Sequence, residues 1–318
     1  MNVVHHELRV RGPHGFQRGL PPGISGLLLE GFQASVAGAV RMAFEGSSRV
    51  VGHRRSWLNA AADVRFDDLE VGDEAVLHFT ARPFGDVAEG IYDQGELWAS
   101  RPDPAWSAID AVAAVVDDVG GTRSDSDRFD SGLLRNLLRF RRVLGDEISE
   151  LRIEAKHRPG QDVGGFATVD SPMIEQARSL NAETPEPREA RVVGSLDMLR
   201  RSTQAFALRL DDGQEVRGVL IGEDVSTISA SLGHRVVVQG QAIFRPSGKL
   251  LRLDARAVLP GEGEGAFWSK VPAPAGSIHP RTARRALQTP TTGVNAFFGR
   301  WPGNESDDAL LAMLDEVR

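Results

Sequence analysis

The sequence has no cysteine and only one tyrosine in 318 residues. The absence of cysteine excludes disulfides, thiolate zinc sites, iron–sulfur clusters and cysteine nucleophiles. Long apolar runs are also missing, because Glu30, Gln33 and Arg41 interrupt the best candidate, residues 26–44. A membrane span needs roughly 18 or more apolar residues, so we expect none. The N-terminus has no basic region followed by an apolar stretch and a small-residue cleavage site, and we therefore expect a cytoplasmic protein.

Lysine is scarce as well. It occurs only at Lys156, Lys249 and Lys270, so arginine supplies almost all of the 37 basic residues. Acidic residues number 44, and the formal net charge is −7. A chain of this charge is not attracted to nucleic acid over its whole surface, although a local basic patch stays open as an interpretation. The hydrophobic share of 41% and the charged share of 25% are ordinary for a globular protein of about two domains.

Residues 1–158 mix both kinds of secondary structure, and we predict an α+β domain whose fold the pattern does not assign. Strands are expected where apolar and polar residues alternate, at residues 3–11, 40–44, 64–66, 75–81 and 151–155. Helices are expected where apolar residues recur every three to four positions, at residues 24–36, 56–62, 104–119 and 130–144. Asp130 or Ser131 is the expected N-cap of the last helix.

Residues 159–188 are predicted to be a linker with a short helix, because they contain Pro/Gly breaks and a polar run with two prolines. Residues 189–260 then contain three strand patterns, a short helix pattern and two more strand patterns. This is the element order of an OB-type β-barrel, and an SH3-like barrel is the alternative. Gly194, Gly218 and Gly240 lie inside the expected strands, where a closing barrel bends.

No motif in the sequence indicates catalysis or a cofactor. Only His5 and His6 are neighbouring histidines, and adjacent residues of a strand point to opposite faces, so we expect no metal site. The sequence has no Gly-x-Ser-x-Gly nucleophile motif and no glycine-rich phosphate loop. We therefore expect a non-enzymatic protein without a cofactor. The alternative is an enzyme whose site forms only in space, for example around His53, His78 and Asp63.

Charged side chains gather in several places. Adjacent acids at 67–68, 117–118, 211–212 and 307–308 diverge from one another, so we expect them to face solvent. Arg135, Arg139 and Arg142 lie on one face of the helix expected at 130–144, and more arginines decorate the expected barrel. Such arginines can bind nucleic acid, but aromatic residues for base stacking are scarce. A salt-bridged arginine surface is favoured, and a nucleic-acid partner is the alternative.

After a flexible linker at 261–290, residues 291–318 form a distinctive tail. Phe297, Phe298 and Trp301 place three aromatic residues within five positions. The segment after the Gly-Arg-Trp-Pro-Gly turn has five acidic residues and one basic residue, and it contains a helix pattern whose apolar stripe includes Leu310 and Leu314. A helix of about 14 residues is marginal alone in water. It must dock either on its own barrel or in the groove of a partner protein.

The run Phe-Phe-Gly-Arg-Trp-Pro-Gly-Asn-Glu-Ser-Asp-Asp, followed by a leucine-bearing helix, resembles the toxin-binding tail of bacterial antitoxins paired with PIN-domain ribonuclease toxins. The resemblance covers about residues 293–318 and implies a tail that covers the active-site groove of the toxin and neutralises it. The matching residues are Phe298, Gly299, Trp301, Pro302, Gly303, Glu305 and Asp307, and Phe297, Leu310 and Leu314 complete the predicted partner-binding set. Asn304 and Asp308 depart from the pattern, which has an acid and a glutamate there. The remainder of the chain resembles uncharacterised bacterial proteins.

Overall fold

The computed structural model describes residues 2–49, 56–92, 102–159, 164–221, 225–261 and 268–274. All of these residues belong to one compact unit, Met1–Ala275. The predicted partner-binding tail, His53, and residues 262–267 and 275–290 of the linker predicted at 261–290 lie outside the described residues.

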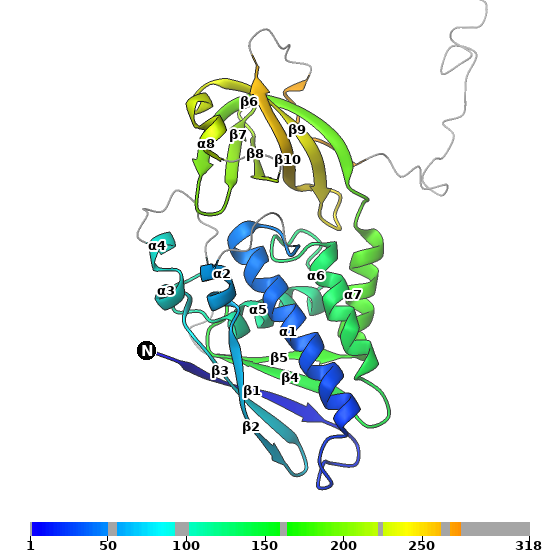
Figure 1. Ribbon diagram of the computed structural model, residues 1–318. Helices are drawn as coiled ribbons and strands as arrows, with labels where there is room; N and C mark the ends of the chain where they lie inside the picture. The colour runs from blue at the N-terminus through cyan, green and yellow to red at the C-terminus, as the bar shows by residue number, and fades with distance from the viewer. Residues whose placement is uncertain are drawn as a thin grey trace, which may run out of the picture. The chain divides into compact units, whose positions relative to one another are not determined.

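The first part of this unit is built on a five-stranded sheet (Figure 1). Its strands are β1 (Val4–Arg11), β2 (Val64–Val71), β3 (Ala75–Ala81), β4 (Glu150–Ala155) and β5 (Gly165–Asp170). Their order across the sheet is β2-β3-β1-β4-β5, and every neighbouring pair is antiparallel. Side chains alternate as the sequence predicts: Leu77 and Phe79 are buried, whereas His78 and Thr80 lie on the half-exposed face. One face of the sheet therefore carries the core and the other is polar.

Helices cover the apolar face of the sheet (Figure 1). The long ones are α1 (Pro22–Glu45), α5 (Ala108–Gly120), α6 (Ser131–Leu137) and α7 (Ser171–Glu183), and the short ones are α2 (Ser56–Ala61), α3 (Phe84–Val87), α4 (Glu89–Tyr92) and the 3₁₀ helix η1 (Leu138–Arg142). By length and composition α1 is apolar enough to cross a membrane. Its Leu28, Phe32 and Val40 are nevertheless fully or almost fully buried in the core, where it packs against α5 and α6. These contacts are those of a core helix.

The helix α1 extends further than the sequence predicts. We expected a strand at 40–44, and that prediction is wrong, because the helix continues to Glu45. It ends where Gly46 adopts a left-handed conformation, φ 68°, and donates its backbone N–H to the carbonyl oxygen of Met42. Similarly, the helix expected at 130–144 is divided into α6 and η1. Asp130 is its N-cap, as one of the two predicted candidates.

The segment predicted as a linker, 159–188, differs from that expectation. Its residues form β5, which pairs with β4, and α7, which packs against α5 and α6. Ala167, Val169, Met173 and Ile174 are buried in the same core as the first 158 residues. The α+β part therefore extends through α7.

The second part is a closed five-stranded barrel, as predicted. Its strands are β6 (Arg188–Arg200), β7 (Ala205–Arg209), β8 (Glu215–Leu220), β9 (Arg235–Phe244) and β10 (Leu250–Pro260), with α8 (Val225–Ile228) and the 3₁₀ helix η2 (Ser229–Ser231) between β8 and β9. The closed order is β10-β8-β7-β6-β9, and the β8–β10 pair is parallel. This connectivity is consistent with an OB-type barrel. Phe206 and Phe244 fill its core, as their sequence pattern indicates.

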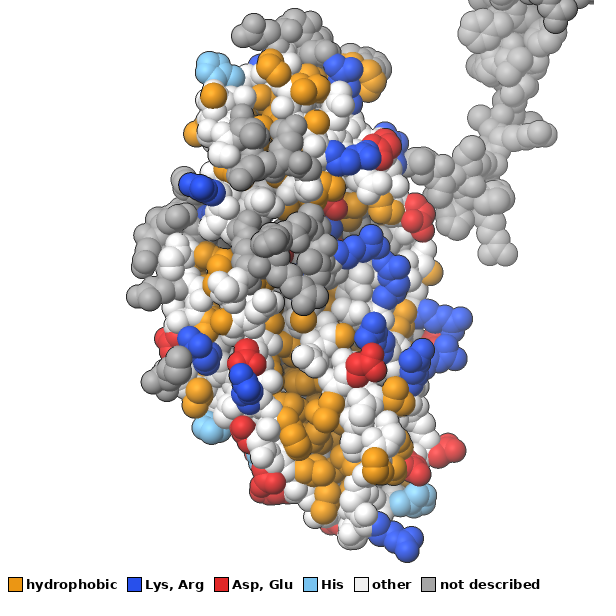
Figure 2. Space-filling view, in the orientation of Figure 1, with side chains coloured by type: hydrophobic (Ala, Val, Ile, Leu, Met, Phe, Trp, Pro, Cys, Tyr) orange, Lys and Arg blue, Asp and Glu red, His pale blue; other side chains and the backbone are white. Residues whose placement is uncertain are grey.

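The edge strand β2 carries apolar side chains that the helices leave partly uncovered. Phe66 is 48% exposed and Val71 is 46% exposed, and Figure 2 shows hydrophobic side chains gathered between α1 and β2. A bulge between Phe66 and Asp68 interrupts the pairing of β2 with β3. Bulges and acidic residues hinder the addition of a further strand, and β2 has both.

Candidate functional site

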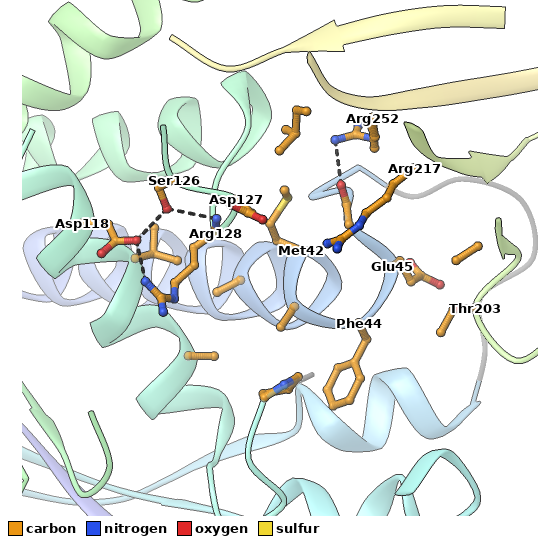
Figure 3. Close-up of a pocket in the computed structure, with 18 of the residues that line it drawn as sticks. Met42, Phe44, Glu45, Asp118, Ser126, Asp127, Arg128, Thr203, Arg217 and Arg252 are labelled. Atoms are coloured by element: carbon orange, nitrogen blue, oxygen red, sulfur yellow. Dashed lines mark hydrogen bonds and ion pairs between the residues drawn. The ribbon is translucent and has the colours of Figure 1, made fainter. Parts of the chain in front are cut away.

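Described residues of the helical part and of the barrel line a cavity of about 910 Å³ (Figure 3). The C-terminal end of α1 contributes Met42 and Phe44, and the loop after α5, residues 122–128, forms a second wall. The barrel contributes Thr203 from the β6–β7 loop and Arg217 from β8. The size is within the range of small-molecule sites, which are about 300–1,000 Å³.

The polar end of the cavity is organised around Asp118, whose side chain is only 2% exposed. Arg123 Nη1 lies 2.8 Å from Asp118 Oδ1, and Arg128 Nη1 lies 2.7 Å from Oδ2. The hydroxyl of Ser126 also donates to Oδ2, at 2.6 Å. Two guanidinium groups therefore share one carboxylate, which leaves one positive charge in surplus within this group.

The buried Arg252 joins β10 to the helical part of the unit. Its side chain is 6% exposed, its Nη1 donates to the carbonyl oxygen of Gly46 at 2.7 Å, and its Nη2 donates to Ser47 Oγ at 3.0 Å. Asp254 Oδ1 lies 2.7 Å from its Nε, and Asp130 Oδ2 lies 3.4 Å from its Nη1. The C-terminal end of α1 carries partial negative charge, so a cation there is favourable.

Asp130 has a second role as the N-cap of α6. Its Oδ1 accepts the backbone N–H groups of Gly132 and Leu133, both at 3.0 Å, and it also accepts the hydroxyl of Ser48. Burial raises the pKa of Asp130, but attraction to Arg252 and the hydrogen bonds from Ser48 outweigh burial, and the pKa lies below its ordinary value. One carboxylate thus links a helix start, the loop after α1 and the barrel.

Further ion pairs connect the 122–128 loop to the β9–β10 hairpin. Lys249 Nζ lies 2.5 Å from Asp125 Oδ2, and Arg245 Nη2 lies 3.6 Å from Asp127 Oδ1. These two acidic residues of the cavity wall are therefore paired with basic residues of the barrel.

A buried cluster of His6, Ser107 and Asp110 contains the residue types of a nucleophilic triad. Ser107 Oγ is 2.9 Å from His6 Nε2 and 2.9 Å from Asp110 Oδ2, and His6 Nδ1 is 2.9 Å from the carbonyl oxygen of Glu154. In a triad the histidine lies between the other two groups. Here the serine lies between them, is fully buried, and caps α5 by accepting the N–H groups of Ile109 and Asp110. The cluster is therefore a structural helix cap.

Of the predicted catalytic alternative the structure describes His78 and Asp63, and it does not bring these two side chains together. His78 Nε2 lies 3.4 Å from Glu70, whereas Asp63 pairs with Arg65 at 2.8 Å near the other end of β2. Within the described ranges, no group of three or more His, Asp or Glu residues is arranged to hold a metal ion.

The three arginines of the predicted nucleic-acid alternative are all exposed. Arg135 lies on α6, where its Nε donates to the carbonyl oxygen of Ser131, and Arg139 and Arg142 lie on η1. Figure 2 shows Lys and Arg side chains gathered on the side of the view where α6 and α7 lie. Arg139 Nη1 pairs with Glu30 at 3.2 Å. The three arginines lie on the consecutive helices α6 and η1, and none of them lines the cavity.

Sequence reasoning missed most of the cavity. The acidic pair 117–118 was expected to face solvent, and for Asp118 that prediction is wrong, because the side chain is buried between two arginines. A signal was available, since Asp118 is three residues after Val115 and so shares its buried helix face. Arg252 and Thr203 gave no comparable signal.

Comparisons with protein families, with characterised proteins and with solved structures find no match to this chain. The protein is therefore classified here by its fold alone: an α+β part with a five-stranded antiparallel sheet, followed by a closed five-stranded barrel.

Proposed function

We propose that this chain is a non-enzymatic interaction protein that binds and neutralises a PIN-type ribonuclease through residues 291–318. The observation that carries the proposal is the sequence of the tail, in which the aromatic turn around Trp301 precedes an acidic, leucine-striped segment. Aromatic anchors with an adjacent apolar stripe are typical of helix-in-groove recognition. Inhibition would be steric, with the acidic segment near the metal site or the substrate groove of the ribonuclease.

The described unit has two hydrophobic cores. Both hydrophobic cores are built from described residues, the first from the α+β part and the second from the barrel. The compact unit ends at Ala275. A chain shortened to residues 1–288 therefore retains every residue of both cores, and we expect it to fold.

The test compares four tagged proteins expressed in the native host: the full chain, the 1–288 truncation, the double variant Phe298→Ala/Trp301→Ala, and Leu232→Ala. Leu232 is a matched control because it is an exposed apolar residue of the barrel. We expect a PIN-type ribonuclease to co-purify with the full chain and with Leu232→Ala only. Equal capture by the truncation would refute the proposal, and so would the absence of any ribonuclease from all four samples.

The exposed arginines favour one second candidate, binding of single-stranded nucleic acid by the surface of Arg135, Arg139 and Arg142. Contacts to phosphates make affinity fall steeply with salt, with a slope of about −0.7 per contact for single strands. The triple Arg→Gln variant should then weaken binding of a single-stranded RNA and flatten its salt dependence. Arg209→Gln, an exposed arginine of β7, should have no effect. Failure of the wild-type protein to bind RNA at low salt removes this candidate.

A further inference from the structure

We propose that the cavity between the barrel and the helices binds a nucleoside monophosphate, a ligand that combines a planar ring with a phosphate. The inference goes beyond the proposed function, because the cavity is lined by the body of the protein and not by its tail. It rests on three features of the cavity: an apolar wall, a group of arginines with surplus charge, and a buried hydroxyl without a partner.

The apolar wall suits a flat ring. Met42, Phe44 and Trp106 line it. The Phe44 ring is fixed by edge-to-face contacts with Trp57 and Phe84, at centroid distances of 5.3 and 5.0 Å. Figure 3 shows Met42 and Phe44 on the α1 side of the cavity. Aromatic and thioether side chains pack well against planar rings, and a wall held by other aromatics needs little rearrangement to do so.

The arginines suit a phosphate. Arg123 and Arg128 share the single carboxylate of Asp118, and each uses Nη1 for that contact. Guanidinium groups bind phosphate oxygens through pairs of N–H donors, so the remaining donors of these two side chains fit an anion.

Four other acidic residues line the cavity, Glu45, Asp103, Asp125 and Asp127, and so do the further arginines Arg200 and Arg217. Asp125 and Asp127 are paired with Lys249 and Arg245 of the barrel, respectively. The carboxylate of Asp103 accepts the backbone N–H of Ala105.

The third feature is Thr203, which lines the cavity from the β6–β7 loop. It is 2% exposed, and its hydroxyl has no hydrogen-bond partner among the described residues. A buried hydroxyl without a partner is unfavourable, since the group has lost its hydrogen bonds to water. A phosphate or ribose oxygen in the cavity would supply the missing partner.

The first experiment measures binding to the full-length protein by calorimetry. The probes are the four nucleoside 5′-monophosphates, the corresponding nucleosides, and ribose 5-phosphate. We expect at least one nucleotide to bind with a Kd below about 1 mM. Its nucleoside and ribose 5-phosphate should each bind at least about tenfold more weakly, because each keeps only half of the contacts. The proposal is overturned if no nucleotide binds, or if either half binds as tightly as the whole.

Variants at Thr203 separate ligand binding from folding. Thr203→Val removes the hydroxyl but keeps the shape, so we expect nucleotide affinity to fall about tenfold without loss of thermal stability in the unliganded protein. Thr203→Ser restores a hydroxyl and should restore affinity. Arg128→Gln should also weaken nucleotide binding, whereas Arg209→Gln, outside the cavity on β7, should not. If Thr203→Val and Arg128→Gln each bind the nucleotide as tightly as the wild type does, the assigned site is wrong.

Discussion

At the scale of single residues, two buried ionisable side chains stand out. Arg252 contacts two carboxylates, a backbone carbonyl and a serine hydroxyl, and three of these partners lie outside the barrel. His6 belongs to β1 and lies on the buried face of the sheet, where its ring nitrogens contact the Glu154 carbonyl and the Ser107 hydroxyl. Neither residue belongs to a hydrophobic pattern, yet each connects segments that are far apart in the sequence.

Replacement of Arg252 by methionine should destabilise the protein by about 3 kcal/mol, because it leaves the buried carboxylate of Asp130 without its cation. Urea unfolding of the variant and the wild type measures this difference. The control is Arg209→Met, whose exposed ion pair with Asp197 should contribute about 0–1 kcal/mol. Equal stability of the two variants would show that Arg252 does not stabilise the junction.

The pH dependence of stability should report on His6. Burial lowers the pKa of His6 below its ordinary value of 6.5, although Asp110 opposes the shift. The unfolded chain therefore binds a proton more readily, and the folded state loses stability as the pH falls below about 6.5. Unfolding free energies measured between pH 8 and 5 should show this loss in the wild type and in His5→Gln, the exposed neighbour. His6→Gln should show a smaller dependence, and an unchanged slope would contradict the assignment.

At the scale of elements, the barrel depends on close approach of its strands. A Cβ atom at Gly218 of β8 would overlap the ring of Phe206 on β7 and come within 2.6 Å of the Leu253 carbonyl oxygen on β10. Gly218 is thus one of the positions where the sequence pattern correctly placed a glycine inside a strand of the barrel.

Gly218→Ala should therefore destabilise the barrel by about 1–3 kcal/mol, the usual effect of overpacking a filled core. Thermal or urea unfolding checks the value. Gly120→Ala is the matched control, because a Cβ atom there meets nothing within 4 Å and alanine favours the helix. A neutral Gly218→Ala would mean that the strands separate easily at this point.

The elements that the sequence predicted well are those with a single exposed face. The barrel strands and β3 alternate clearly, because one side of each strand faces a core. The prediction failed at 40–44, where Val40, Met42 and Phe44 are all buried although they lie on a helix. Phe44 packs against Trp57 and Phe84, so the end of α1 is covered on more than one side. A helix buried on several sides loses the period that identifies it.

The candidate cavity was harder to predict than the fold for a related reason. Its groups come from α1, from the loop after α5 and from four barrel strands, and only folding brings them together. Charge pairing such as that of Asp118 with Arg123 and Arg128 depends on loop geometry, which residue spacing does not encode. The tail is the opposite case, since its interpretation depends on consecutive residues alone.

At the scale of the whole molecule, we propose that the folded unit binds a small ligand and that the tail recognises a protein partner. The cavity is lined by both parts of the unit, and Arg252 and the 122–128 loop connect these parts. Since the tail lies beyond Ala275, its removal should leave the cavity and both cores intact.

Neutralisation by the tail is tested by inhibition of a PIN-type ribonuclease from the native host, measured as cleavage of a labelled RNA. Full-length protein is titrated against the enzyme beside the 1–288 truncation and the Phe298→Ala/Trp301→Ala variant. We expect stoichiometric inhibition by the full chain, and inhibition at least about a hundredfold weaker by the other two proteins, because they lack hot-spot residues. Inhibition by the truncation at the same concentration as the full chain, or no inhibition by the full chain, would contradict the proposed function.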